Sequence, residues 1–251
     1  MPDAALRAAH RVVVLTGAGV SAESGIATFR DAQTGLWERF AAEDLATPRA
    51  FLRDPALVWG WYEWRRMQVL RAQPNPAHRA IAALERRVPA LTVVTQNVDD
   101  LHERAGSAAV VHLHGSLHAP RCFDCASPFA LPPDPPCEPE GGRRLAPPRC
   151  VRCGGAVRPG VVWFGESLPA KAWREAAQAV ADCELLLTVG TSGLVHPAAG
   201  LPALARRHGA TVVVLDPVPT ALDAVAQHVL RGKAGELLPA LLEAAFGAGA
   251  P

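Results

Sequence analysis

The stretch "RVVVLTGAGVSAESG", residues 11–25, decides the fold of this chain. It begins with a short run of β-branched residues, which is typical of a buried strand, and continues into glycines. Gly17-x-Gly19-x-x-Ala22 has the spacing of a dinucleotide-binding turn, in which the backbone approaches a pyrophosphate at a helix N-terminus. A tight packing turn without a ligand would fit the same residues. The stretch therefore predicts a strand, a turn and a helix, and leaves the ligand open.

Three further apolar runs repeat this pattern. They are "ALTVVTQN" (90–97), "ELLLTVGTSG" (184–193) and "ATVVVLDPVPT" (210–220). Strands that are apolar on both faces indicate a parallel sheet covered by helices, and helical patterns follow at 170–183 and 201–209. We predict a Rossmann-like, doubly wound α/β domain with its ligands beyond the carboxyl ends of the strands.

Two segments interrupt this alternation. Residues 34–86 read as mostly helical, and residues 117–159 are rich in proline and glycine. We predict that residues 1–33, 87–116 and 160–251 form the dinucleotide-binding domain. A helical module (34–86) and a cysteine-containing module (117–159) would form a smaller domain.

The cysteine pattern predicts a metal site. Four of the six cysteines form two CxxC pairs, and in a reducing compartment this spacing favours a metal over disulfides. Four thiolates make a closed tetrahedral shell for one structural Zn²⁺, with the ligands Cys122, Cys125, Cys150 and Cys153. Such an ion would stabilise a module that is poor in apolar residues. Cys137 and Cys183 are read as free thiols.

Polar residues follow each predicted strand. Gln96, Asn97 and Asp99 can hold a ribose or a carboxamide, although an Asn/Asp helix cap is the ordinary role of such residues. The later strands are followed by residues that can bind phosphate or ribose, namely Thr191, Ser192 and Asp216. His112 and His114 have strand spacing and would share a face. His114, at the strand exit, is the better candidate for a general base.

Composition excludes several classes of protein. The formal net charge of the 251-residue chain is +1, so a strong general affinity for nucleic acid is not expected. No apolar run approaches the roughly 20 residues of a membrane helix. The N-terminus enters a strand almost at once, so we expect no signal peptide and a cytoplasmic protein. An ordinary dehydrogenase would need an acidic ribose-binding residue roughly 20 positions after the glycines, and it is missing.

Together these motifs resemble the sirtuins, a family of NAD-dependent protein-lysine deacylases. The resemblance runs from about Val12 to Leu238 and is carried by "GAGVSAESGIATFR", "TQNVDDLHERAG", "HLHGS", the four cysteines, "GVVWFGE" and "GTSG". It implies the same architecture as the one predicted above. It also implies removal of acyl groups from lysine side chains of other proteins, with release of nicotinamide and 2′-O-acyl-ADP-ribose.

The resemblance also implies roles for individual residues. Asn97 and Asp99, with Gln96, would hold the nicotinamide ribose and carboxamide, and His114 would be the general base on a ribose hydroxyl. Phe29 would shield the sugar, and Arg30 would support the phosphate side. Further NAD contacts are implied for Gly17, Ala18, Gly19, Ala22, Thr28, Gly190, Thr191, Ser192, Asp216 and Ala234. An added substrate strand would pair with a segment that includes Val162, Phe164 and Gly165.

One departure from the family pattern concerns Asp216. It stands where the family usually has asparagine. A carboxylate accepts from a ribose hydroxyl but cannot donate to it, which makes this adenosine contact less secure.

The stretch "VWGWYEWRRM", residues 58–67, bears on the acyl group. If this stretch is a helix, Arg65 lies three residues after Tyr62 and within reach of its side chain, and tryptophans surround the pair in the sequence. Guanidinium can bind a carboxylate with two hydrogen bonds, and the phenol adds a third. Within the sirtuins such a Tyr-x-x-Arg pair marks the subgroup that removes succinyl, malonyl and glutaryl groups. Ala42 and Ala46 would line the acyl tunnel.

Alternatives stay open at this point. Arg66 also lies within reach of Tyr62, and both groups would sit on the helix surface if they had no ligand. A general deacetylase, a mono-ADP-ribosyltransferase and a non-catalytic zinc module are the competing functions. The expected cofactors are NAD and one structural Zn²⁺. The expected partners are acylated lysines of other proteins, with no membrane, no specific nucleic acid and no second copy of the chain.

Overall fold

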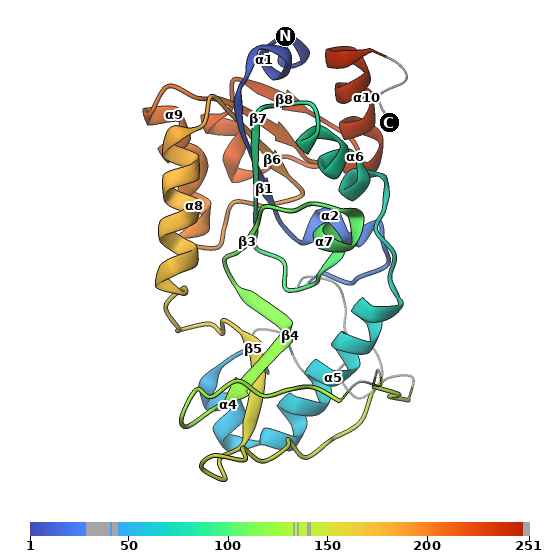
Figure 1. Ribbon diagram of the computed structural model, residues 1–251, viewed down its shortest axis with the longest axis vertical. Helices are drawn as coiled ribbons and strands as arrows, with labels where there is room; N and C mark the ends of the chain where they lie inside the picture. The colour runs from blue at the N-terminus through green and yellow to red at the C-terminus, as the bar shows by residue number, and fades with distance from the viewer. Residues whose placement is uncertain (29–40, 42–44, 133, 135, 140–141, 248–251) are drawn as a thin grey trace. The chain divides into compact units, whose positions relative to one another are not determined.

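The computed structural model describes residues 1–28, 41, 45–132, 134, 136–139 and 142–247 (Figure 1). The chain forms two compact units. Unit 1 comprises Met1–Gly25, Gln73–Leu113 and Pro169–Pro251, and unit 2 comprises Ile26–Ala72 and His114–Leu168. These bounds differ in detail from those drawn on the sequence, because residues 73–86 pack in unit 1, whereas residues 26–28, 114–116 and 160–168 pack in unit 2.

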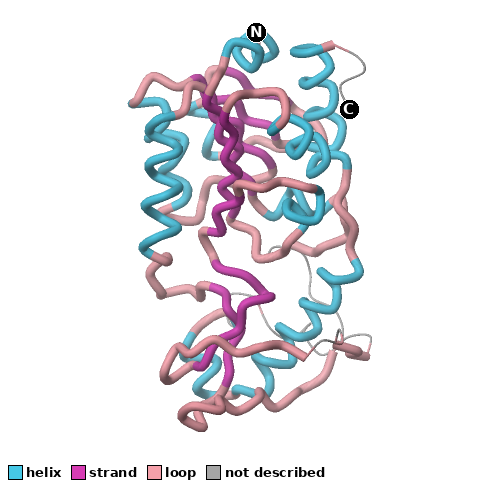
Figure 2. Tube along the Cα trace, in the orientation of Figure 1, coloured by secondary structure: helices cyan, strands magenta, loops and turns pink. Residues whose placement is uncertain are grey.

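Unit 1 is built on a six-stranded sheet in the order β3-β2-β1-β6-β7-β8, with every neighbouring pair parallel. Figure 2 shows the strands in magenta, with helices in cyan on either side. The strands are β1 (Arg11–Thr16), β2 (Ala90–Thr95), β3 (Val110–His112), β6 (Leu185–Val189), β7 (Thr211–Leu215) and β8 (His228–Leu230). Strand order reverses between β1 and β6, which is where ligands bind in such sheets. The predicted doubly wound sheet is confirmed.

Helices cover both faces of this sheet (Figure 1). On one face Val12 and Val14 of β1 belong to a core with α1 (Pro2–Ala8), α6 (Pro76–Glu85) and α10 (Ala234–Phe246). On the other face α8 (Ala170–Asp182) and α9 (Leu201–Arg207) pack on β1, β6 and β7. Shorter helices are α2 (Ala18–Ala22), α7 (Leu101–Ala105), η2 (Ala198–Gly200) and η3 (Ala221–Val225). In the described part of the chain, none of the helices has the length and apolarity needed to cross a membrane.

Unit 2 combines two helices with a two-stranded ribbon. α4 (Pro48–Arg53) leads into α5 (Pro55–Arg71), which begins where the Asp54 carboxylate accepts a hydrogen bond from the Leu57 N–H at 3.0 Å. β4 (Gly115–Cys122) pairs antiparallel with β5 (Val157–Val161). This ribbon was not predicted from the sequence, because its strands are interrupted by proline and glycine and pair across a long insertion.

A loop of the cysteine-containing module packs directly on α5. The Leu145 N–H donates to the Ala56 carbonyl at 2.9 Å, and Arg144 pairs with Asp54 at 2.7 Å. A Cβ atom at Gly60 would overlap the Arg143 carbonyl. Glycine at this position therefore lets the loop approach the helix backbone.

Candidate functional site

The glycine turn after β1 packs against the end of β6. A Cβ atom on Gly17 would lie 2.7 Å from the Gly190 carbonyl oxygen, and one on Gly19 would lie 2.8 Å from the Gly190 Cα. Gly190 itself has φ +59°, which favours glycine, and its carbonyl accepts from the Gly19 N–H at 2.9 Å. Packing between two chain segments is therefore enough to require these glycines. Ala18 is half-buried and Ala22 is exposed on the five-residue α2.

Ser21 links Asn97 to Asp99 near the carboxyl end of β2. The Ser21 hydroxyl accepts from Asn97 Nδ2 at 3.0 Å and donates to Asp99 Oδ2 at 3.0 Å. The other Asp99 oxygen accepts from the Leu101 N–H at 3.1 Å. Burial raises the pKa of Asp99, although these hydrogen bonds oppose the rise. Sequence reasoning missed Ser21, because nothing in its spacing distinguishes it from Ser24.

A second set of polar contacts ties the end of β2 to the ends of β1 and β6. Gln96 Nε2 donates to Thr191 Oγ1 at 2.9 Å, and the Gln96 N–H donates to the Thr16 carbonyl at 3.0 Å. Ser192, the next residue, is half-buried. These contacts bring together residues that the sequence placed at the ends of different strands.

Asp216 directly follows β7, and Ala234 is the first residue of α10. The Asp216 carboxylate accepts from the Val218 N–H at 3.1 Å, which makes it a turn cap. Ala234 is buried in the first turn of α10. Both residues are thus held by local structure.

A buried network fixes the backbone beneath Asn97. The Asn97 N–H donates to Thr95 Oγ1 at 3.0 Å, and the Thr95 and Thr16 hydroxyls lie 2.8 Å apart. Thr16 Oγ1 in turn lies 3.0 Å from His102 Nε2. Burial lowers the pKa of His102 to about 3, so its imidazole is neutral at physiological pH.

The two histidines of "HLHGS" have different surroundings. His112 ends β3 in unit 1, with its ring 2.6 Å from a Glu103 carboxylate oxygen and 3.2 Å from the Asn97 carbonyl. Burial opposes a charge on this ring, but these partners outweigh it and raise the pKa of His112. Residues 113–114 form a turn before β4, so the single strand expected through both histidines is interrupted. His114 belongs to unit 2, where its carbonyl accepts from the Val162 N–H at 2.8 Å.

Tyr62 and Arg65 are buried on α5, with 3% and 9% of their surfaces exposed. The Tyr62 oxygen accepts from the Trp163 indole N–H at 3.0 Å. Burial raises the pKa of Tyr62, so its phenol keeps its proton. The Arg65 guanidinium lies 5.2 Å from the Trp61 ring centroid, and its Nη2 lies 3.4 Å from the Ala27 carbonyl.

Arg66, the neighbouring candidate, is engaged by an acidic residue on its own helix. Its Nε and Nη2 donate to the two carboxylate oxygens of Glu63 at 3.2 and 2.9 Å. Both side chains are buried, so the pair is shielded from solvent. The charge of Arg66 is therefore balanced by Glu63 on the same helix, which makes Arg65 the better candidate for binding a carboxylate.

The backbone N–H groups of the predicted substrate segment already donate hydrogen bonds to other parts of this chain. The Val162, Trp163 and Phe164 N–H groups donate to the His114 carbonyl, the Glu166 carboxylate and the Ala46 carbonyl. Phe164 is 46% exposed, and Gly165 follows with φ +86°. An added strand would therefore have to pair through groups other than these three N–H donors.

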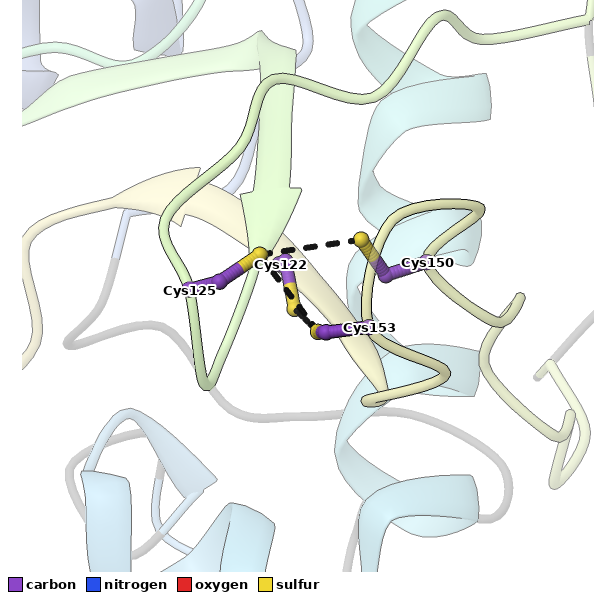
Figure 3. Close-up of side chains that lie close together, drawn as sticks. All are labelled: Cys122, Cys125, Cys150 and Cys153. Atoms are coloured by element: carbon purple, nitrogen blue, oxygen red, sulfur yellow. Dashed lines mark hydrogen bonds between the residues drawn. The ribbon is translucent and has the colours of Figure 1, made fainter.

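The four cysteines of the two CxxC pairs point toward one another (Figure 3). Their sulfur atoms all lie within 4.8 Å of one another, with individual separations of 3.4 and 3.7 Å. Four thiolates about 2.3 Å from one zinc ion would lie about 3.8 Å apart, so the cluster fits tetrahedral zinc. The predicted cluster is confirmed. Cys137 and Cys183 are free thiols, and Cys183 caps the end of α8.

Phe29, Arg30 and Ala42 lie outside the described residues. Thr28 is half-buried in unit 2, and Ala46 is buried there.

Comparisons with known proteins agree on one family. The Sir2 family model matches residues 17–197. An NAD-dependent protein deacylase of Methylococcus capsulatus is 64% identical over 241 residues, which cover 96% of this chain and 94% of that protein. NAD-dependent protein deacylase 1 of Pseudomonas aeruginosa is 63% identical over 96% of both chains. A crystal structure of a Sir2 homologue in complex with NAD superposes with a TM-score of 0.89 and 46% identity, over 96% of this chain and 91% of that one. This chain belongs to the Sir2 family.

Proposed function

We propose that this protein is an NAD-dependent protein-lysine deacylase that prefers acidic acyl groups, namely succinyl, malonyl or glutaryl. The general activity is supported by the near full-length similarity to proteins named NAD-dependent protein deacylases. The acyl preference depends on one observation, the burial of Tyr62 and Arg65 together on α5.

The donor set of unit 1 fits NAD. Asn97, Asp99 and the Gln96–Thr191 pair gather amide, carboxylate and hydroxyl groups at the carboxyl ends of β2 and β6. Such groups suit the hydroxyls of a ribose and the carboxamide of nicotinamide. NAD supplies the ADP-ribosyl group to which the acyl group is transferred.

The residues of this chain would bind and orient NAD and the substrate, and one of them would accept a proton. Ser21 holds the Asn97 amide and the Asp99 carboxylate in one arrangement before NAD binds. His114 would take a proton from a ribose hydroxyl, which turns that hydroxyl into a nucleophile. The segment 162–165 would hold the backbone of the substrate peptide.

The acyl preference follows from charge. Guanidinium has five N–H donors, so Arg65 can hold a carboxylate in addition to its contacts inside unit 2. The protonated Tyr62 phenol can donate to the same carboxylate. An acetyl group offers no charge to this buried cation, and losing such a partner costs roughly 2–5 kcal/mol. A selectivity of about 30- to 5000-fold follows.

The proposal also covers the role of zinc and the location of the protein. Zinc would hold the cysteine-containing module in shape and take no part in the chemistry, because four thiolates leave no open coordination position. Free thiols and a thiolate metal site suit a reducing compartment, so we propose a cytoplasmic location. We also propose that the protein is a monomer.

The test is kcat/KM on one peptide that carries acetyl-, malonyl-, succinyl- or glutaryl-lysine, with and without NAD. Arg65→Met should lower activity on the acidic acyl peptides about 100-fold more than activity on the acetyl peptide. Arg71→Met is the matched control, because the same change is made at an exposed position of the same helix. His114→Ala gives the inactive reference.

Product analysis by mass spectrometry separates the alternatives. The proposal expects free lysine, nicotinamide and 2′-O-acyl-ADP-ribose in equal amounts. An ADP-ribosylated peptide would assign a transferase activity instead. Equal losses on acetyl and succinyl peptides in Arg65→Met would remove the carboxylate-binding role of Arg65.

A further inference from the structure

The structure couples the predicted acyl pocket to the predicted substrate strand through one side chain. Trp163 lies in the segment 162–165, between Val162 and Phe164, and its indole reaches Tyr62 on α5. Both Trp163 and Tyr62 are almost completely buried, with 1% and 3% of their surfaces exposed. Their hydrogen bond is therefore shielded from solvent.

The direction of this hydrogen bond is fixed by chemistry. An indole N–H can only donate, so the Tyr62 oxygen accepts at 3.0 Å. The phenol oxygen thereby uses one lone pair on Trp163, and its own hydrogen is directed to a different acceptor. Without the indole donor, the hydroxyl hydrogen could turn about the C–O bond toward the side where the indole had been, and a lone pair of the oxygen would then face the pocket and repel a carboxylate.

Trp163 is itself held from two sides. Its backbone N–H donates to Glu166 Oε2 at 2.8 Å, and Glu166 pairs with Arg158 at 2.9 Å. The Arg158 guanidinium lies 3.5 Å from the Trp163 ring centroid, in a cation–π contact. The Phe51 ring packs on the indole with a centroid distance of 5.4 Å. The indole therefore has little freedom to move away from Tyr62.

We propose that Trp163 is a specificity-determining residue that directs the Tyr62 hydroxyl as a donor toward the acyl carboxylate. This inference rests on the proposed acyl preference and deepens it. Trp163 does not touch the reacting atoms; it acts through Tyr62. Because Trp163 lies in the segment 162–165, the residues that would bind the peptide backbone are in direct contact with the residues that would bind the acyl group.

The experiment is a double-mutant cycle on the ratio of kcat/KM for succinyl-lysine to that for acetyl-lysine. Trp163→Phe keeps an aromatic ring and removes the N–H donor. It should lower the ratio roughly ten-fold through the KM of the succinyl peptide, with the KM for NAD little changed. In a Tyr62→Phe background, where no hydroxyl remains to be directed, the same change should have no further effect on the ratio. A purely structural role of Trp163 would instead lower the ratio additively.

Controls keep the outcome interpretable. Trp173→Phe makes the same change on α8 of unit 1 and should leave the ratio as in the wild type. If Trp163→Phe does not fold, replacing Trp163 alone with benzothienylalanine removes its indole N–H and preserves the ring shape. In the wild type, the ¹⁵N–¹H signal of the Trp163 indole should also shift with succinyl-lysine peptide and not with acetyl-lysine peptide.

Failure of this inference is distinguishable from failure of the proposed function. A wild-type enzyme without any preference for acidic acyl groups would overturn both. A wild-type preference that survives unchanged in Trp163→Phe, or falls additively with Tyr62→Phe, would overturn only the role of Trp163.

Discussion

At the scale of single residues, Ser21 holds together the polar groups at the end of β2. It is 2% exposed, and its hydroxyl bridges the Asn97 amide and the Asp99 carboxylate. A buried carboxylate that loses a hydrogen bond becomes harder to ionise. The arrangement of Asn97 and Asp99 therefore depends on a side chain that has no charge and no titratable role.

Ser21→Ala should lower kcat/KM for NAD about 10- to 100-fold, because a hydrogen bond to a charged group contributes about 1.5–3 kcal/mol. The pKa of Asp99 should rise further, so activity should fall off at a higher pH on the acidic side of the profile. Steady-state kinetics with NAD varied between pH 5 and 8 measures both effects. Ser107→Ala is the control, because the buried Ser107 hydroxyl makes no hydrogen bond within the described chain. Wild-type kinetics in Ser21→Ala would contradict the bridging role.

At the scale of elements, α5 is enclosed by its surroundings. Its buried positions include charged residues, and a loop of the cysteine-containing module crosses it at Gly60. Alanine is normally preferred to glycine inside a helix by about 1 kcal/mol. At this position the tertiary contact reverses that preference, since a methyl group would overlap the Arg143 carbonyl.

Gly60→Ala should therefore destabilise the protein by about 1–3 kcal/mol, as other overpacked sites do. Thermal unfolding followed by circular dichroism measures the change in melting temperature. The matched control is Gly200→Ala, because a methyl group at Gly200 would meet no atom within 4 Å. A rise in melting temperature for Gly60→Ala would show that the loop does not rest on the helix.

At the scale of the whole molecule, the chain has two units with different sources of stability. Unit 1 has a large apolar core between its sheet and helices. Unit 2 contains the antiparallel ribbon and the four-cysteine cluster, so part of its stability would come from zinc.

Removal of zinc with a chelator should loosen unit 2 far more than unit 1. Hydrogen exchange should lose protection in β4 and β5, while β1, β6 and β7 stay protected. Metal analysis should find one zinc per chain, which is lost in Cys150→Ser and retained in Cys137→Ser, since Cys137 lies outside the cluster. Equal loss of protection in both units would contradict separate sources of stability.

Much of the fold could be predicted because its signals are local. The runs at 11–16, 90–95, 185–189 and 211–215 are apolar on both faces, and each is a strand of the sheet. β8 was missed because three residues carry too little pattern, and the β4–β5 ribbon was missed because its strands are distant in sequence. The polar residues after β2 could be identified, but Ser21 could not, because its role depends on where α2 meets the end of β2.

The sequence by itself determined the parallel sheet, the four-cysteine cluster and the spacing of Tyr62 and Arg65, because each follows from periodicity or ligand spacing along the chain. Only the tertiary structure decided that α5 is buried and that the Trp163 indole reaches Tyr62. The physical reason is that the burial of a helix and the choice of hydrogen-bond partner in the core depend on segments far apart in sequence. Trp163 and Tyr62, separated by 101 positions, are an example.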